Sequence, residues 1–140
     1  MTEALSPISA AIAELLAAPA VSAITTRIRA HEPAASDSLG AGSYLPFIVV
    51  SLGDAPPRPY MPVRDATLYV RAYGVTAAQA ETLGLACEAV FANAGARKAA
   101  SGLGVWHSTI VSSGIDKDPA TLQFLWSLVV RYPTTILAIP

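Results

Sequence analysis

Histidine and cysteine side chains supply much of the catalysis and metal binding in proteins, and this chain has few of either. There are two histidines, His31 and His107, and one cysteine, Cys87. Metal sites need several such ligands at short spacing, so the sequence predicts no metal site. Cys87 falls in an apolar helical stripe, which is typical of a buried, unreactive thiol. A lone cysteine excludes an internal disulfide and fits a reducing compartment.

Other catalytic and cofactor motifs are incomplete. No serine lies in a G-x-S-x-G context. Gly40 and Gly42 match half of a dinucleotide-binding fingerprint, but a strand, not the required helix, is expected after them. Asp116 and Asp118 have the spacing that opens a calcium loop, without the glutamate that closes it. The sequence therefore predicts no cofactor and no catalytic residue.

The composition predicts a chain that is largely covered by other proteins. Of the 140 residues, 53% are hydrophobic and 14% charged, against about 25% charged in average soluble domains. The apolar stretches at 8–24 and 122–140 both contain charge and proline, so neither gives the roughly 20 clean residues of a membrane span. We therefore expect contacts with copies of itself. A net charge of −1 argues against a surface that binds nucleic acid.

Local signals predict two helices. Ser6 and Pro7 form a typical helix start before apolar residues at helical spacing, and Pro19 ends that helix. Thr76 and Gln79 have the spacing of a capping box, which opens a second helix that runs to about residue 94.

Strands are expected between and after these helices. They are residues 25–29, Phe47–Leu52, 65–74, 103–112 and 121–132, with a turn at 113–119. The predicted fold is α+β, with a mainly antiparallel sheet of four to five strands and two helices on one face, in the order α-β-β-β-α-β-β. Residues 1–132 would form one domain, followed by an extended C-terminal arm at 133–140.

Several surface features are candidate contact sites. Residues 65–74 alternate, with small aliphatic side chains on one side and Tyr69, Arg71 and Tyr73 on the other, a composition typical of a protein interface. This second face is also a candidate platform for stacking single-stranded nucleic acid, although no basic groove surrounds it. Residues 53–62 hold four prolines, typical of a stiff connection, or alternatively of a polyproline II ligand.

Four features together resemble a known family. An alanine-rich N-terminal helix leads to a short strand around Ile28. After a long loop comes the segment 44–50 (YLPFIVV). Residues 68–74 (LYVRAYG) then run directly into the second helix, and a pair of strands closes the chain. Over nearly its whole length the chain resembles the tail terminator (tail completion) proteins of long-tailed bacteriophages and related phage-like particles.

The resemblance implies a structural role without catalysis or a cofactor. It implies a hexameric ring, assembled in the host cytoplasm, on the head-proximal end of the virion's tail tube. The ring would stop tube polymerisation and offer a docking surface to head-completion proteins, while DNA passes through the lumen without being read. The loops and the C-terminal arm would reach adjacent subunits or the tube, so the candidate interface residues are Tyr69, Arg71, Tyr73, Pro57, Arg58, Tyr60, Leu39, Tyr44, Ile136 and Leu137.

Two other functions stay open at this level. One is a head-closure or connector protein of the same phage neck, which would bind a portal–adaptor complex rather than tail tubes. The other is a small α+β enzyme or ligand-binding domain, in which His107 acts with Asp116 or Glu88.

Overall fold

A computed structural model gives the fold of residues 6–31, 46–92, 94–98, 103–118 and 123–138. Within these residues, three helices and seven strands follow one another. Their bounds are α1 Pro7–Ala17, α2 Pro19–Ser22, β1 Ile28–Ala30, β2 Phe47–Leu52, β3 Val63–Gly74, α3 Ala77–Phe91, β4 Arg97–Lys98, β5 Leu103–Val105, β6 Thr109–Lys117 and β7 Phe124–Ala138. None of the helices in these residues combines the length and the apolarity needed to span a membrane.

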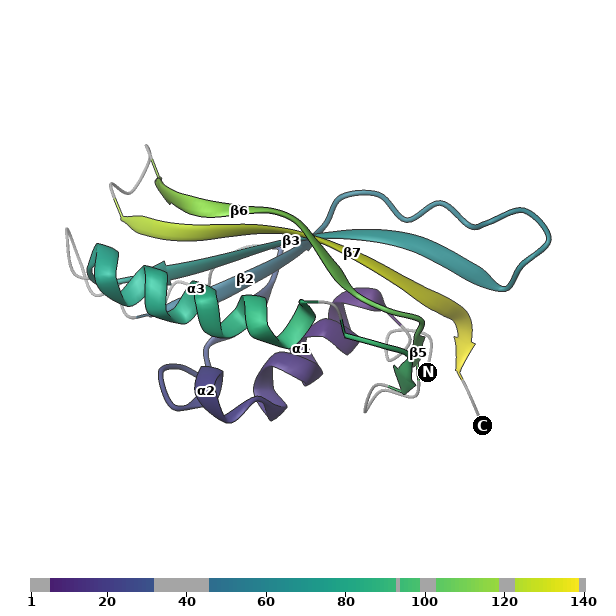
Figure 1. Ribbon diagram of the computed structural model, residues 1–140, viewed down its shortest axis with the longest axis horizontal. Helices are drawn as coiled ribbons and strands as arrows, with labels where there is room; N and C mark the ends of the chain where they lie inside the picture. Colours follow the sequence, from purple (N-terminus) through teal and green to yellow (C-terminus); the bar gives the residue numbers. More distant parts are fainter. Residues whose placement is uncertain (1–5, 32–45, 93, 99–102, 119–122, 139–140) are drawn as a thin grey trace.

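The strands form one twisted sheet with β3 and β7 at its centre (Figure 1). The strand order is β1-β2-β3-β7-β5-β4, and β6 pairs with β7 beside β5. All pairs are antiparallel except β1 with β2, which is parallel. The α+β class is confirmed, but the predicted four to five antiparallel strands are a mixed sheet of seven, because the two-residue strand β4 has no strong sequence pattern and the predicted strand 103–112 divides into β5 and β6.

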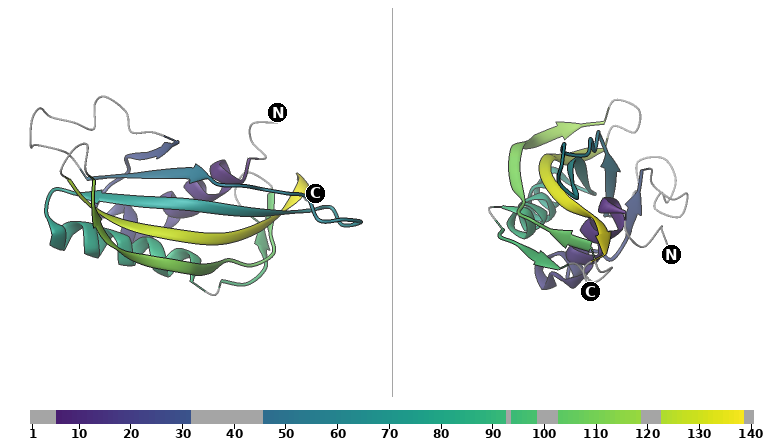
Figure 2. Two further views of the ribbon diagram at one scale, coloured as in Figure 1. Left: turned by 90° about the horizontal axis from the view of Figure 1, so that it is seen from above. Right: turned by 90° about the vertical axis from the view of Figure 1, so that its right-hand side faces the viewer.

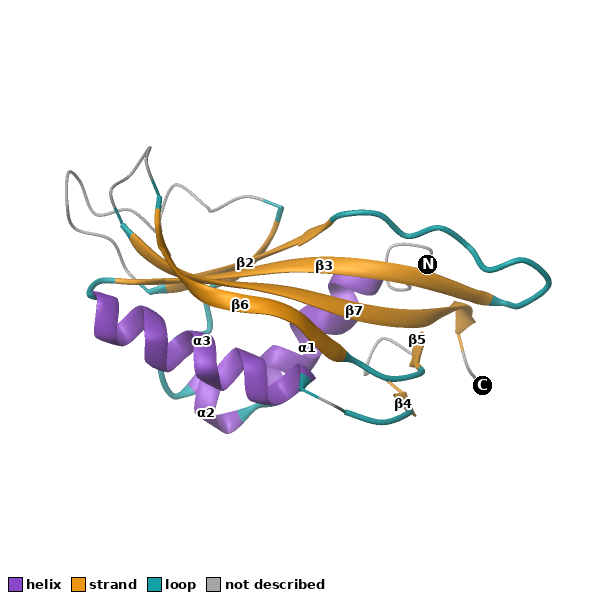
Figure 3. Cartoon of the chain, turned by 45° about the horizontal axis from the view of Figure 1, so that its top comes forward, coloured by secondary structure: helices purple, strands orange, loops and turns teal. Residues whose placement is uncertain are grey.

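The helices lie together on one face of the sheet (Figures 1 and 3). Alternate residues of β3, namely Ala66, Leu68, Val70 and Ala72, are buried beneath them with Leu128 and Val130 of β7. The helices contribute Leu15, Leu83 and Phe91 to the same core. The period-two alternation of β3 therefore orients its aliphatic side chains as the sequence predicts.

Local capping sets where the two longer helices begin. The Ser6 hydroxyl accepts from the backbone N–H of Ile8, and the Thr76 hydroxyl accepts from that of Gln79. The side chain of Gln79 in turn accepts from the backbone N–H of Val75, at 2.8 Å. Both predicted starts are confirmed. Helix α3, the second of the two predicted helices, ends at Phe91, three residues before the predicted end at 94.

The segment 113–119, predicted as a turn, is strand as far as Lys117. Ser113 to Lys117 pair with Leu128 to Phe124 of β7 in unbroken antiparallel register. A bulge near Val111 shifts the register once. The turn-forming residues Gly114 and Asp116 are tolerated because the pairing with β7 outweighs local preference, and because β6 is exposed.

The sequence predicts a separate C-terminal arm at 133–140, but residues 133–138 continue strand β7. Val63, Arg64 and Asp65 pair with Thr135, Thr134 and Pro133, and Leu103 pairs with Ala138. The Pro133 carbonyl accepts from the backbone N–H of Trp106 at 2.9 Å. The ring nitrogen of Pro133 faces the same edge of β7 as its carbonyl, at the point where the strand paired with β7 changes from β6 to β5. The missing N–H of Pro133 therefore interrupts no ladder.

Candidate assembly surface

The face of the sheet opposite the helices, here called the outer face, carries the predicted contact residues of β3. No described helix covers it (Figure 3). Tyr69 is 42% exposed and its ring lies against Gly53, where an added Cβ would come within 2.4 Å of the ring. Arg71, half-buried, stands opposite Val49 and Ser127. Its Nε is buried without a hydrogen-bond partner.

Tyr73 lies on the outer face but is only 4% exposed. Its ring stacks on Phe47 with the ring centroids 4.4 Å apart, in a second small cluster with Val49 and Leu125. Burial raises the pKa of its phenol. Tyr73 therefore has little exposed surface in the single chain, because its neighbours on β2 and β7 are large and apolar, and its role in contacts stays a prediction.

The connection between β2 and β3, here called the hairpin arm (residues 53–64), extends beyond the rest of the molecule (Figures 1 and 2). It contains the predicted contact residues Pro57, Arg58 and Tyr60. Pro57 is exposed, and Tyr60 at the tip is fully so. Arg58 donates to both carboxylate oxygens of Asp65, at 2.9 Å each, and its guanidinium carbon lies 5.5 Å from the Trp106 ring centroid.

A cleft of about 450 Å³ lies at the base of the hairpin arm. Its polar lining includes Asp54, Asp65, Thr67, His107 and Arg131. The hydrogen bond from Arg58 holds the pKa of Asp65 below its usual value, and the positive charge of Arg58, Arg131 and His107 acts in the same direction. Sequence reasoning missed this group, because Asp54, Asp65 and Arg131 stand on three segments that only the β2–β3–β7 register brings together.

The catalytic alternative drawn from the sequence is not assembled. Asp116 lies seven residues along β6 from Thr109, roughly 23 Å at the usual rise of a strand, whereas His107 precedes Thr109 and lines the cleft. Glu88 is on α3, beneath the other face, where it accepts from the Ser113 hydroxyl at 3.2 Å. His107 therefore pairs with neither carboxylate.

The remaining predicted contact residues have no side-chain description. Leu39 and Tyr44 lie outside the described residues. The backbone of Ile136 and Leu137 belongs to β7, and their side chains fall outside the described part. Their role in contacts stays a prediction.

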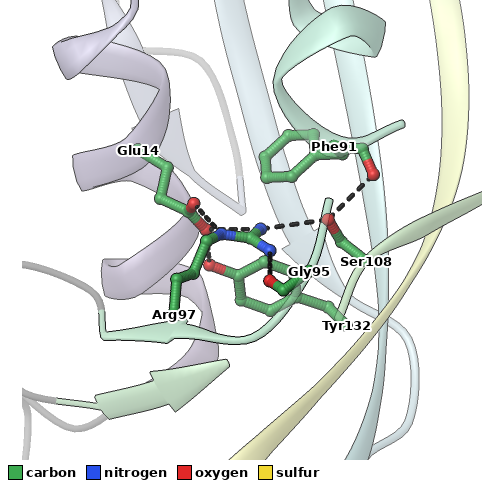
Figure 4. Close-up of polar contacts among 6 residues, drawn as sticks. All are labelled: Glu14, Phe91, Gly95, Arg97, Ser108 and Tyr132. Carbon is green, nitrogen blue, oxygen red and sulfur yellow. Dashed lines mark hydrogen bonds and ion pairs between the residues drawn. The ribbon is translucent and has the colours of Figure 1, made fainter. Parts of the chain in front are cut away.

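Beneath the sheet, a buried polar cluster joins α1, β4 and β7 (Figure 4). The Glu14 carboxylate accepts from the guanidinium of Arg97 and from the Tyr132 hydroxyl. Arg97 also donates to Ser108, whose hydroxyl donates to the Phe91 carbonyl at 2.8 Å. Burial, reinforced by the carboxylate of Glu14, raises the pKa of Tyr132. Every member bonds another, so the cluster is a structural clamp.

Cys87 is fully buried, as predicted, and burial raises the pKa of its thiol to about 12. Within the described residues, no three histidine, cysteine, aspartate or glutamate side chains gather closely enough to hold a metal ion. What the described surface offers is contact area: an outer sheet face, a projecting arm and a charged cleft.

Comparison with known proteins gives a likeness of fold. No family model and no curated protein matches the chain. Among solved structures, it is similar to a chain from "Virion of native gene transfer agent (GTA) particle", with a TM-score of 0.57 and 19% sequence identity. The match covers 91% of this chain and 93% of that one. At this identity the similarity establishes a shared fold over nearly the full length of both chains.

Proposed function

We propose that this chain is a non-enzymatic structural subunit of a phage-like virion, and specifically a tail terminator. Copies of it form a ring, six-membered by its resemblance to the tail terminator family. The ring caps the head-proximal end of the tail tube, ends tube growth and receives the head-completion protein. DNA passes through its lumen without sequence-specific contacts.

The observation that carries the proposal is the fold shared with a chain of the gene transfer agent virion. The likeness spans nine-tenths of both chains, so it involves most of the fold rather than one common motif. It agrees in particle type with the sequence resemblance to tail terminators, which rests on other evidence, namely the order of patterned segments.

The surface of the subunit supports an assembled state. The chain carries only 14% charged residues, and large apolar side chains are exposed at Leu16, Tyr60, Met61, Tyr69, Val75, Leu85, Trp106, Val111 and Ile115. These residues lie on both faces and on the hairpin arm. A ring subunit needs contacts in several directions, with two neighbours and with the structures above and below.

A tube-length assay tests the proposal. The purified protein is added to the tail tube protein of the same particle during polymerisation, and tubes are measured by electron microscopy. We expect rings at one end of shortened, uniform tubes. Tubes of unchanged length with bare ends would contradict a terminator, and preferential binding to a portal–adaptor complex would identify a neck connector instead.

A further inference from the structure

The hairpin arm is a stiff projection. Backbone hydrogen bonds join the two sides of the arm. The Arg58 N–H donates to the Val63 carbonyl at 2.8 Å, and the Asp65 N–H donates to the Pro56 carbonyl at 2.9 Å. Arg64 donates to the Ala55 carbonyl at 2.7 Å. Four prolines fix φ along the same stretch. The arm therefore holds one position, and its tip lies beyond the end of the sheet (Figure 2).

The tip of the arm presents apolar side chains to solvent. Tyr60 is fully exposed and Met61 is 40% exposed. Tyr60 also has φ 62°, a left-handed conformation that is uncommon for a residue other than glycine, asparagine or aspartate. Tyrosine and methionine are enriched at the centres of protein interfaces. A stiff arm that carries them at its end is suited to inserting into another surface.

A groove of complementary character lies on the helical side of the molecule. It runs between α1–α2 and α3 and has a volume of about 450 Å³. It is lined by Glu14, Ala17, Ala18, Pro19, Ala20, Ala86, Ala89 and Val90. The small side chains leave a shallow, open and mainly apolar depression with one carboxylate. An aromatic ring that enters it would lose its water-exposed surface.

The charges of the arm and the groove also match. The hairpin arm contains Arg58 and Arg64, with Asp54 at its base and Arg58 paired to Asp65, whereas the three helices contain Glu14, Glu81 and Glu88 and no basic residue. Glu14, which lines the groove, already accepts from Arg97 and Tyr132 of the same chain, so the match rests on the sign of the surrounding charges and not on a hydrogen bond to Tyr60. Complementary charge around an apolar contact fixes its orientation and disfavours wrong pairings.

We propose that the tip residues Tyr60 and Met61 of one copy seat in the groove between α1–α2 and α3 of the next copy. The tip and the groove lie at different places on the molecule (Figure 1), so a copy cannot fill its own groove with its stiff arm. Two different surfaces meet in this contact. Such head-to-tail contacts generate closed rings when the rotation between copies closes. The inference thus rests on the ring of the proposed function and names its subunit interface.

Complementary variants test the contact. Tyr60→Ser with Met61→Ser removes the tip, Ala89→Arg fills the groove, and Asp116→Ser, at an exposed position of β6 outside both surfaces, is the control. We expect the tip and groove variants each to weaken self-association by about tenfold or more, the usual effect of losing a central aromatic contact, at unchanged melting temperature. The Asp116→Ser variant should assemble like the unmodified protein.

Mixing the two defective variants gives the sharper result. Each retains one working surface, so the mixture should form one-to-one dimers and nothing larger, as measured by sedimentation. A twofold-symmetric contact would not give this pattern. Assembly of either variant like the unmodified protein, or a mixture that stays monomeric, would overturn the proposal.

Cross-linking locates the contact directly. Met61→Cys and Ala89→Cys chains, mixed under mild oxidation, should form a disulfide between copies, while buried Cys87 stays reduced. A Met61→Cys chain mixed with a Val75→Cys chain is the control, and equal cross-linking in both mixtures would overturn the proposal. If rings cap tubes but the tip and groove variants still form them, only this inference fails. If the unmodified protein forms no ring, the proposed function fails with it.

Discussion

Glu14 of α1 and Arg97 of β4, 83 residues apart in the chain, form a two-point ion pair beneath the sheet. One of the two contacts joins Arg97 Nη2 to Glu14 Oε1 at 3.1 Å. The same carboxylate accepts from the hydroxyl of Tyr132 in β7. The centroid of the Tyr132 ring lies 5.8 Å from Arg97 Cζ. The N-terminal helix, the short strand β4 and the longest strand are therefore joined at one carboxylate.

Replacing Glu14 should destabilise the fold. The side chains of Glu14 and Arg97 are 15% and 23% exposed, so Glu14→Ala leaves a largely buried guanidinium and a buried phenol without their acceptor. We expect a loss of about 3 kcal/mol of unfolding free energy, measured by urea denaturation. Glu81→Ala, on the exposed side of α3, is the control and should change it by less than about 0.5 kcal/mol. Equal midpoints for the two variants would show that the cluster contributes nothing.

Gly84 should tolerate no side chain. A Cβ at this position of α3 would lie 2.0 Å from Trp126 Cγ. Alanine favours a helix by about 1 kcal/mol over glycine, yet we expect Gly84→Ala to lower the melting temperature, because overpacking costs typically 1–3 kcal/mol. Gly95→Ala, where a Cβ would meet nothing within 4 Å, is the matched control. A stabilised Gly84→Ala variant would mean that Trp126 does not pack there.

Cys87 should react with thiol reagents only when the protein unfolds. With a pKa of about 12, the thiolate fraction at pH 8 is about one in ten thousand, and the sulfur is also inaccessible. We expect modification in a colorimetric thiol assay to be slow in buffer and complete in strong denaturant. Similar rates of Cys87 modification in buffer and in denaturant would contradict its burial on the inner face of α3.

The hairpin arm should loosen in acid. The folded-state pKa of Asp65 is depressed by Arg58, so this pair contributes stability above the unfolded-state value of 3.8 and loses it as the pH falls through the lowered one. The indole N–H signal of Trp106, under Arg58, should shift in that range by NMR, whereas that of Trp126 stays. Asp65→Asn should abolish the pH-dependent shift. A Trp106 signal that moves equally in this variant would assign the effect to another group.

The sequence predicts the strongly patterned elements well. The alternation along residues 65–74 predicts both β3 and its buried side, because the aliphatic residues at every second position must face the helices. Thr76 and Gln79 predict the start of α3 through their hydrogen bonds. In both cases the signal is local and does not depend on which strand lies next to which.

The sequence does not predict the features that depend on which strands pair with each other. Gly114 and Asp116 favour a turn locally, yet β6 passes through them because β7 supplies a partner. A proline normally ends a strand, yet β7 continues through Pro133, because the strand paired with β7 changes there from β6 to β5. The charged cleft of Asp54, Asp65 and Arg131 requires the same register. No spacing within the sequence encodes these neighbours.

The proposed function requires self-assembly into a closed ring, and the mass of the free protein tests this most directly. In sedimentation equilibrium of the purified 140-residue chain, over a wide range of concentration, the mass should reach one fixed multiple of 14.5 kDa and grow no further. The resemblance to tail terminators makes that multiple six. A protein that remains a monomer at every concentration, or that grows without limit, would contradict the account.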